Sequence, residues 1–200
     1  MAPLVGSGLW FGTSSRGFGV FAIGNTTLTT NIFTYSSAAV AASTNLTSET
    51  YGCAAAGNST EGVFALGHNG TSPSPTTNIF TYANAAVAAS TNLTSNSEYG
   101  AAAGNSTEGV FALGYNNNSY TPTTNIFTYA NAAVAASTNL TSNLYGGAAA
   151  GNSTEGVFAL GDTSTTTNIF TYANAAVAAS TNLTSNLYGG AASSASPGGF

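Results

Sequence analysis

One pattern is repeated along most of this chain, and the repeat limits the possible folds more than any other feature. The segment GNSTEGVFALG occurs at 57–67, 104–114 and 151–161, with a shorter copy at 18–24. The segment TTNIFTYANAAVAASTNLTSN starts at Thr76, Thr123 and Thr166, with a variant copy starting at Thr29. Equivalent residues recur about every 43–47 residues, a period typical of stacked or circular repeat architectures.

Each unit contains several short stretches that favour β-strands. YGAAAG and GVFALG are apolar runs joined by Asn-Ser-Thr-Glu, a composition typical of hairpin turns. NIFTY is rich in β-branched and aromatic residues, which suit a pleated surface. The Ala-rich run AAVAASTNL is ambiguous, because alanine also favours helices. We predict a fourth strand there, since the run is short for a helix and has no caps or charges.

Four short strands in a unit of about 45 residues are typical of one blade of a β-propeller. We therefore predict an all-β protein, a four-bladed β-propeller formed by a single repeat domain over 1–200. Length changes are confined to the Gly-, Pro-, Asn- and Ser-rich loops between the two conserved segments. We expect the following segments: units at about 8–50, 51–97, 98–143 and 144–186, an extra closing strand at 187–192, and a flexible tail at 193–200.

The unit resembles a kelch repeat. In that pattern an apolar strand ends in glycine, and a variable loop leads to a strand with a tyrosine and then a tight turn. Val110–Gly114 (VFALG) matches the first part, and Ile126–Tyr129 (IFTY) with the following Ala130-Asn131 matches the second. The resemblance implies a kelch-like propeller. The near-identical units are also similar in style to degenerate kelch-like repeats of phage virion and tail-associated proteins, including those of cyanophages.

The charge content argues against several classes of partner. Only 4% of residues are charged, Arg16 is the one cation among Lys and Arg, and the net charge is −5. Nucleic acids and anionic membranes require clustered basic residues, so we expect neither as a partner. The sequence has no stretch of 18 consecutive apolar residues, so it does not predict a membrane span. The first residues lack the pattern of a signal peptide, so we expect synthesis in the cytoplasm and a place on a virion or particle surface.

The sequence does not predict a catalytic or metal site, and we expect no enzyme activity and no cofactor. His68 is the only histidine and lies in a variable loop, and Cys53, aligned with Ala101, is expected to be a small buried residue. Glu61, Glu108 and Glu155 repeat at one place in the unit. They could form a cation site, but solvated turn residues are the favoured interpretation.

One loop carries the chemistry of a binding site. The residues YNNNSY place Tyr115 and Tyr120 around a run of asparagines that includes Asn116 and Asn117. Aromatic rings beside amides are suited to stacking on sugars and bonding their hydroxyls. We name these four residues and Trp10 as a candidate ligand-binding set, with the alternative that this is only a long decorated loop.

Together these features predict a non-enzymatic structural or surface-recognition protein. We expect a virion or tail-associated component that mediates assembly or attachment to a host surface. Its expected partners are other virion or assembly subunits, further copies in a homo-oligomer, and cell-surface glycans. Two alternatives are a glycan-binding, lectin-like propeller and a self-assembling extracellular filament subunit. One sequence does not separate these three functions.

Overall fold

The protein is an all-β molecule with four separate antiparallel sheets. The computed structural model describes residues 17–22, 28–117, 119–161, 163–187, 189 and 192. Trp10 and the expected tail at 193–200 lie outside this described part.

Each sheet belongs to one copy of the repeat. The first contains β1 (Phe18–Ala22), β2 (Thr30–Thr34) and β3 (Ala39–Ala42). The second contains β4 (Ala54–Gly57), β5 (Glu61–Ala65), β6 (Thr77–Thr81) and β7 (Ala86–Ala89). The third contains β8 (Ala101–Gly104), β9 (Glu108–Tyr115), β10 (Tyr120–Thr128) and β11 (Ala133–Ala136). The fourth contains β12 (Ala148–Gly151), β13 (Glu155–Ala159), β14 (Thr167–Thr171) and β15 (Ala176–Ala179).

The strands follow one another in chain order within every sheet. The second, third and fourth sheets each have the four predicted strands, whereas the described part of the first sheet has three. The Ala-rich run forms the outer strand of each sheet, so the strand prediction was right and the helix alternative was wrong. A tight turn precedes that strand, and its last residue is an alanine with positive φ: Ala38, Ala85, Ala132 or Ala175. In the fourth sheet this turn includes a short 3-10 helix, Tyr172–Asn174.

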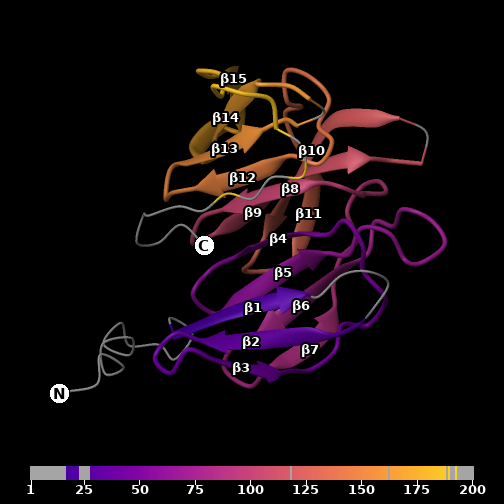
Figure 1. The fold of residues 1–200 in the computed structure, drawn as a ribbon, viewed down its shortest axis with the longest axis vertical. Coiled ribbons are helices and arrows are strands. Elements are labelled where there is room, and N and C mark those ends of the chain that lie inside the picture. Colours follow the sequence, from indigo (N-terminus) through magenta and orange to yellow (C-terminus); the bar gives the residue numbers. More distant parts are fainter. Residues whose placement is uncertain are drawn as a thin grey trace.

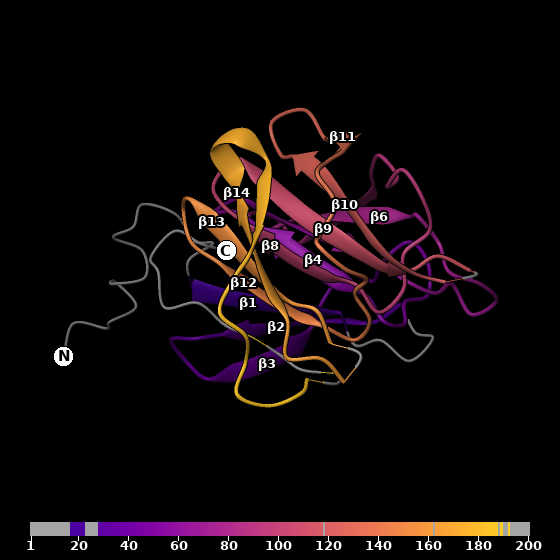
Figure 2. The same ribbon diagram turned by 90° about the horizontal axis from the view of Figure 1, so that it is seen from above.

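The sheets follow one another along the long axis of the molecule (Figure 1). The view from above shows the successive sheets largely overlapping (Figure 2). Small residues allow close approach between them. A Cβ on Gly109 would lie 3.0 Å from the Ala56 Cβ of the second sheet, and one on Gly156 would lie 3.0 Å from the Ala103 Cβ of the third. Contacts this short are tighter than packed side chains tolerate, which explains why glycine and alanine recur here.

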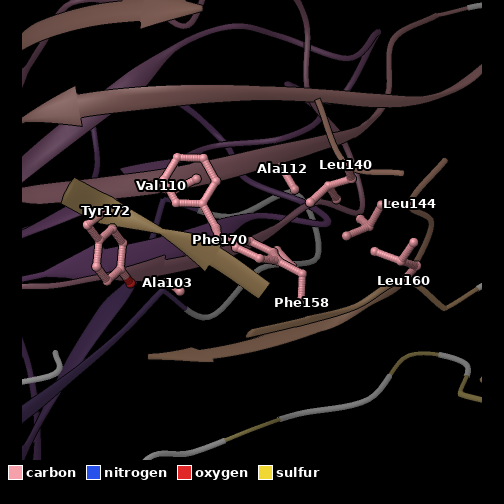
Figure 3. Close-up of a cluster of buried hydrophobic side chains, with 10 residues drawn as sticks. Ala103, Val110, Ala112, Leu140, Leu144, Phe158, Leu160, Phe170 and Tyr172 are labelled. Atoms are coloured by element: carbon pink, nitrogen blue, oxygen red, sulfur yellow. The ribbon is translucent and has the colours of Figure 1, made fainter. Parts of the chain in front are cut away.

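The core is divided among the junctions between consecutive sheets. Figure 3 shows the junction between the third and fourth sheets. The third unit contributes Ala103, Val110, Ala112 and Leu140, while the fourth contributes Phe158, Leu160, Phe170 and Tyr172. Equivalent residues form the two earlier junctions. Each unit therefore presents valine, alanine and one leucine to the unit after it, and phenylalanine, tyrosine and another leucine to the unit before it.

A repeated hydrogen-bond clamp also joins consecutive sheets. Asn125 is fully buried in β10, and its Oδ1 accepts bonds from the Thr94 backbone N–H at 2.7 Å and the Thr94 hydroxyl at 3.1 Å. Its Nδ2 donates to Thr94 Oγ1 at 2.9 Å and to the Thr124 carbonyl at 2.8 Å. The pairs Thr47–Asn78 and Thr141–Asn168 repeat this geometry. The clamp satisfies the buried amide completely and fixes the position of each sheet on the next.

The described part of the expected closing strand lies against the fourth unit. Leu187 forms an isolated bridge with Ser164, and the Gly189 N–H donates to the Gly146 carbonyl at 2.8 Å. Residues 188, 190 and 191 lie outside the described part of the chain.

Candidate binding surface

Five tyrosine rings form a continuous row across the second, third and fourth units. We call this row the tyrosine ladder; its members, in spatial order, are Tyr51, Tyr99, Tyr145, Tyr120 and Tyr115. Successive ring centroids lie 5.5, 4.9, 4.4 and 5.6 Å apart. The first two contacts are edge-to-face and the last two are tilted. Such geometries are favourable for aromatic pairs, so the rings support one another as a preformed surface.

The last two rungs come from the longest hairpin of the molecule. Tyr115 ends β9 and Tyr120 begins β10. The two residues lie opposite each other in the strand register of that hairpin. The Tyr115 hydroxyl donates to the Asn117 carbonyl at 3.2 Å. The Asn116 backbone N–H donates to the Ser119 carbonyl at 3.3 Å, which closes the turn. The hairpin thereby places the predicted ring pair against Tyr145 of the fourth unit.

Tyr99, the second ring of the row, is held in an uncommon backbone conformation. Its φ is 54°, and the residues at the equivalent place in the neighbouring units are glycines, Gly52 (φ 60°) and Gly146 (φ 57°). A left-handed conformation costs a non-glycine residue about 1–2 kcal/mol. In return, the Tyr99 ring fills the space between Tyr51 and Tyr145, and its hydroxyl donates to the Tyr51 hydroxyl at 3.0 Å. Strain retained in this way is typical of functional surfaces.

A column of backbone hydrogen bonds sets the spacing of the ladder. The Tyr99 N–H donates to the Gly52 carbonyl at 2.9 Å, and the Gly146 N–H donates to the Tyr99 carbonyl at 3.1 Å. These bonds connect successive units directly beneath the rings. The distance between rungs is therefore fixed by the stacking of the units and not by flexible side chains.

The sequence predicted two of the five rungs. Tyr115 and Tyr120 come together as expected, with Asn116 and Asn117 beside them, whereas Trp10 lies outside the described residues. Tyr51, Tyr99 and Tyr145 were not among the predicted candidates because each belongs to an apolar segment that we assigned to a strand. The repeated Tyr-Gly pair before each AAAG strand was the available signal.

Accessibility along the ladder suits a ligand that lies across several rungs. Tyr51 is 39% and Tyr120 is 38% exposed, and the other three rings are partly buried. His68 extends the row beyond Tyr51, with its ring centroid 6.5 Å from the tyrosine ring. Burial, together with the hydrogen bond to Tyr51, raises the pKa of the Tyr99 phenol, so this phenol stays neutral at physiological pH.

A second group of tyrosines lies inside the molecule. The hydroxyls of Tyr82, Tyr129 and Tyr172 lie over glycine pairs of their own sheets; a Cβ on Gly109, for example, would lie 3.0 Å from the Tyr129 hydroxyl. Tyr129 and Tyr172 are buried, and their hydroxyls have no hydrogen-bond partner among the described residues. Burial raises the pKa of Tyr82 to about 12. Tyr35, the equivalent residue of the first unit, is 64% exposed and does not share this buried placement.

The repeated glutamates are not the solvated turn residues that we expected. Glu61 and Glu108 begin β5 and β9 and are partly buried. One carboxylate oxygen of each is buried without a hydrogen-bond partner in the described structure. Desolvation raises the pKa of both carboxyls. Within the described part of the chain, no three His, Cys, Asp or Glu side chains gather at a place that could hold a metal ion.

The two isolated reactive side chains have structural surroundings. His68 Nδ1 accepts the Gly70 N–H at 3.1 Å within its loop. Cys53 is a partly buried free cysteine. Strand register pairs Ala54 and Ala101 with equivalent partners, so Cys53 occupies the place of Gly100 and not that of Ala101 as we aligned it.

The remaining surface features are modest. A hollow of about 250 Å³ opens between the first two sheets, lined by Val20 and Ile32 on one side and by Phe80, Tyr82 and 83–85 on the other. Across the described residues, no helix has the length and apolar character needed to cross a membrane.

No protein-family model matches the chain, and no curated protein matches it either. The tyrosine ladder is consequently the surface on which a function can be argued.

Proposed function

We propose that the protein is a non-enzymatic surface-recognition module that binds neutral carbohydrate chains along the tyrosine ladder. The observation that carries this proposal is the unbroken row of five rings, with centroid spacings of 4.4–5.6 Å. An aromatic face stacks on the apolar face of a sugar ring, and phenol hydroxyls bond the sugar's hydroxyls. The edge-to-face contacts turn successive tyrosine rings so that aromatic faces and hydroxyl-bearing edges alternate along the row. A polysaccharide likewise presents apolar ring faces and hydroxyl-bearing edges.

The charge distribution favours a neutral ligand. The chain has no lysine and one arginine, Arg16. Glu98, which directly precedes Tyr99 in the chain, is itself buried. An anionic polymer would therefore find no lysine or arginine to pair with in the described part of the chain, and its desolvation there would be uncompensated. A neutral glycan needs only stacking and hydrogen bonds, both of which the ladder offers.

The wider biological setting stays a prediction from the sequence. That prediction places the protein in a virion or tail and makes its sheets the blades of a kelch-like propeller. In this setting, the tyrosine ladder would attach the particle to a host surface. A closed four-bladed ring would require the first and fourth sheets to meet through the junction that joins the other pairs. Carbohydrate binding by the ladder does not depend on that closure.

The test is calorimetric titration with neutral oligosaccharides of increasing length, drawn from β-glucan, xylan, mannan and chitin series. We expect affinity to rise with chain length until the ladder is covered. Tyr120→Ser should weaken binding of the best oligosaccharide about tenfold, the effect of losing about 1.4 kcal/mol. Tyr35→Ser is the matched control, because Tyr35 is exposed but lies on the first sheet away from the ladder.

Two results would contradict the proposal. One is equal weakening by the Tyr120 and Tyr35 substitutions, which would show that the ladder is not the site. The other is binding of a proline-rich peptide with no response to any neutral glycan, since aromatic grooves also accept such peptides.

A further inference from the structure

The first and last units of the stack each expose one half of the junction that joins the sheets. In repeat proteins the terminal units usually carry a polar outer face that prevents association. Here the fourth unit is nearly identical in sequence to the internal ones, and the first unit keeps the GVFA and TTNIFTY segments. Both outer faces therefore keep the apolar residues of a junction.

The fourth unit exposes the side of the junction that carries valine and leucine. Val157 is 40% exposed, whereas its equivalent Val110 is fully buried against the fourth sheet. Leu183 is 38% exposed, whereas its equivalent Leu140 is 4% exposed. The arm that carries Leu183 is folded as in the other units, because its N–H donates to the Thr165 carbonyl at 2.8 Å. We call this surface the Val–Leu face.

The first unit exposes the opposite side of the junction, which carries aromatic residues. Phe21 is 54% exposed, while its equivalent Phe158 is fully buried. Tyr35 is 64% exposed, while its equivalent Tyr172 is 8% exposed. Phe33 and Tyr35 turn edge-to-face with each other at 5.2 Å. We call this surface the Phe–Tyr face.

The two faces also carry the unused halves of the asparagine clamp. Asn31 stands in the register of Asn125, yet among the described residues its side chain bonds only the Thr30 carbonyl, at 2.8 Å. Thr184 follows Leu183 as Thr141 follows Leu140, and it is exposed with no asparagine partner among the described residues. A polar pair that is bonded at three junctions inside the chain is thus divided between its two ends.

We propose that the Val–Leu face of one copy of this chain packs against the Phe–Tyr face of a second copy, head to tail, with Thr184 bonding Asn31. The complementarity is the one that the chain already uses three times between its own sheets. The first and fourth sheets, which carry these faces, lie at the two ends of the stack in Figure 1, so each copy offers one face of each kind. A contact between two different faces propagates, and copies add until they form a filament or a closed ring. This inference is independent of carbohydrate binding.

The test compares the mass of the full chain with that of two single-face variants by light scattering and sedimentation over a range of concentrations. The unmodified chain should assemble into multiples of 19.7 kDa as concentration rises. Phe21→Ser and Leu183→Asn should each remain monomeric, because each variant lacks one working face. Tyr120→Ser should assemble normally; it is the matched control, since Tyr120 and Leu183 are both 38% exposed. Circular dichroism establishes that all variants are folded.

Mixing the two single-face variants distinguishes head-to-tail contact from other association. The Phe21 variant keeps a working Val–Leu face, and the Leu183 variant keeps a working Phe–Tyr face. Their mixture should form a heterodimer and grow no further. A monomeric unmodified chain at all concentrations would overturn the proposal, as would assembly that survives both substitutions or a mixture that stays monomeric.

A cross-link identifies which copy supplies each face. Asn31→Cys and Thr184→Cys are combined with Cys53→Ala, so that only the new thiols can pair. We expect oxidation to give a series of linked dimers and larger species on a non-reducing gel. A single intramolecular link would show that the first and fourth sheets of one chain meet in a ring, and would overturn the head-to-tail assignment.

Discussion

The buried asparagine clamp allows a quantitative test of how the sheets are held together. In the substitution Asn125→Ala, the Thr94 N–H and the Thr124 carbonyl both lose their side-chain partner. The Thr94 hydroxyl loses its two bonds to the amide as well. A buried polar group left unpaired costs about 1–3 kcal/mol. Thr94 is itself exposed, so water can reach part of the broken clamp. We therefore expect a total loss of about 2–3 kcal/mol.

The same substitution at Asn31 is the internal control. Asn31 has the same neighbours along its strand, but within the described part of the chain its side chain bonds only the adjacent Thr30 carbonyl. Asn31→Ala should cost about 0.5 kcal/mol, the lower end for a single partly exposed hydrogen bond. Both variants replace an asparagine at the same strand position with alanine. They differ because Asn125 bonds a threonine of the preceding unit, whereas Asn31 has no such partner among the described residues.

Urea unfolding measures both values, at a concentration low enough to keep the chain monomeric. The midpoint should fall clearly for Asn125→Ala and scarcely for Asn31→Ala, with unchanged slopes. Combining Asn125→Ala with Thr94→Ala should cost less than the sum of the single changes, because both remove the same bonds. Equal losses at Asn31 and Asn125 would refute the reasoning, since they would mean that the first unit is clamped within its own chain.

Other substitutions test the local conformations and the ionisable groups. Ala38→Gly should stabilise the fold by up to about 1 kcal/mol in thermal unfolding, because glycine adopts the observed φ of 51° without strain. Tyr99→Gly should leave the free energy of unfolding within about 1 kcal/mol, because relief of strain offsets lost ring contacts, yet weaken glycan titration. Tyr82 should lose its stabilising contribution between pH 10 and its raised pKa of about 12, seen as cooperative unfolding with phenolate absorbance. Because the folded pKa of Glu108 is raised, stability should decline as pH rises above 4.5, and Glu108→Gln should reduce that decline in urea midpoints across pH.

The repeat accounts for what could be predicted about the fold. Strand identity follows from local composition, so the GVFALG, NIFTY and Ala-rich segments all form the expected strands. The Ala-rich run shows the limit of intrinsic propensity, since pairing with β6, β10 and β14 places it in a sheet although alanine favours helices. Close approach of sheets likewise follows from glycine and alanine at fixed places in each unit.

The candidate site was only partly predictable because it is formed between units. Tyr115 and Tyr120 belong to one hairpin, so their proximity follows from the loop that joins them. Tyr51, Tyr99 and Tyr145 lie far apart in sequence, and only the stacking of units brings their rings into contact. Tyr99 was especially hidden, because a one-residue difference from its neighbouring units places it where they have glycine.

The sequence by itself therefore determined the periodic all-β architecture, the near absence of charge, and the two aromatic residues of the long loop. Those properties depend on local composition and on contacts within one unit. The tertiary structure decided which tyrosines share a surface, which glutamates are desolvated, and which residues at the two ends lack a partner. Each of these depends on what the neighbouring unit contributes, and identical units such as those of Leu140 and Leu183 differ in exposure for that reason alone.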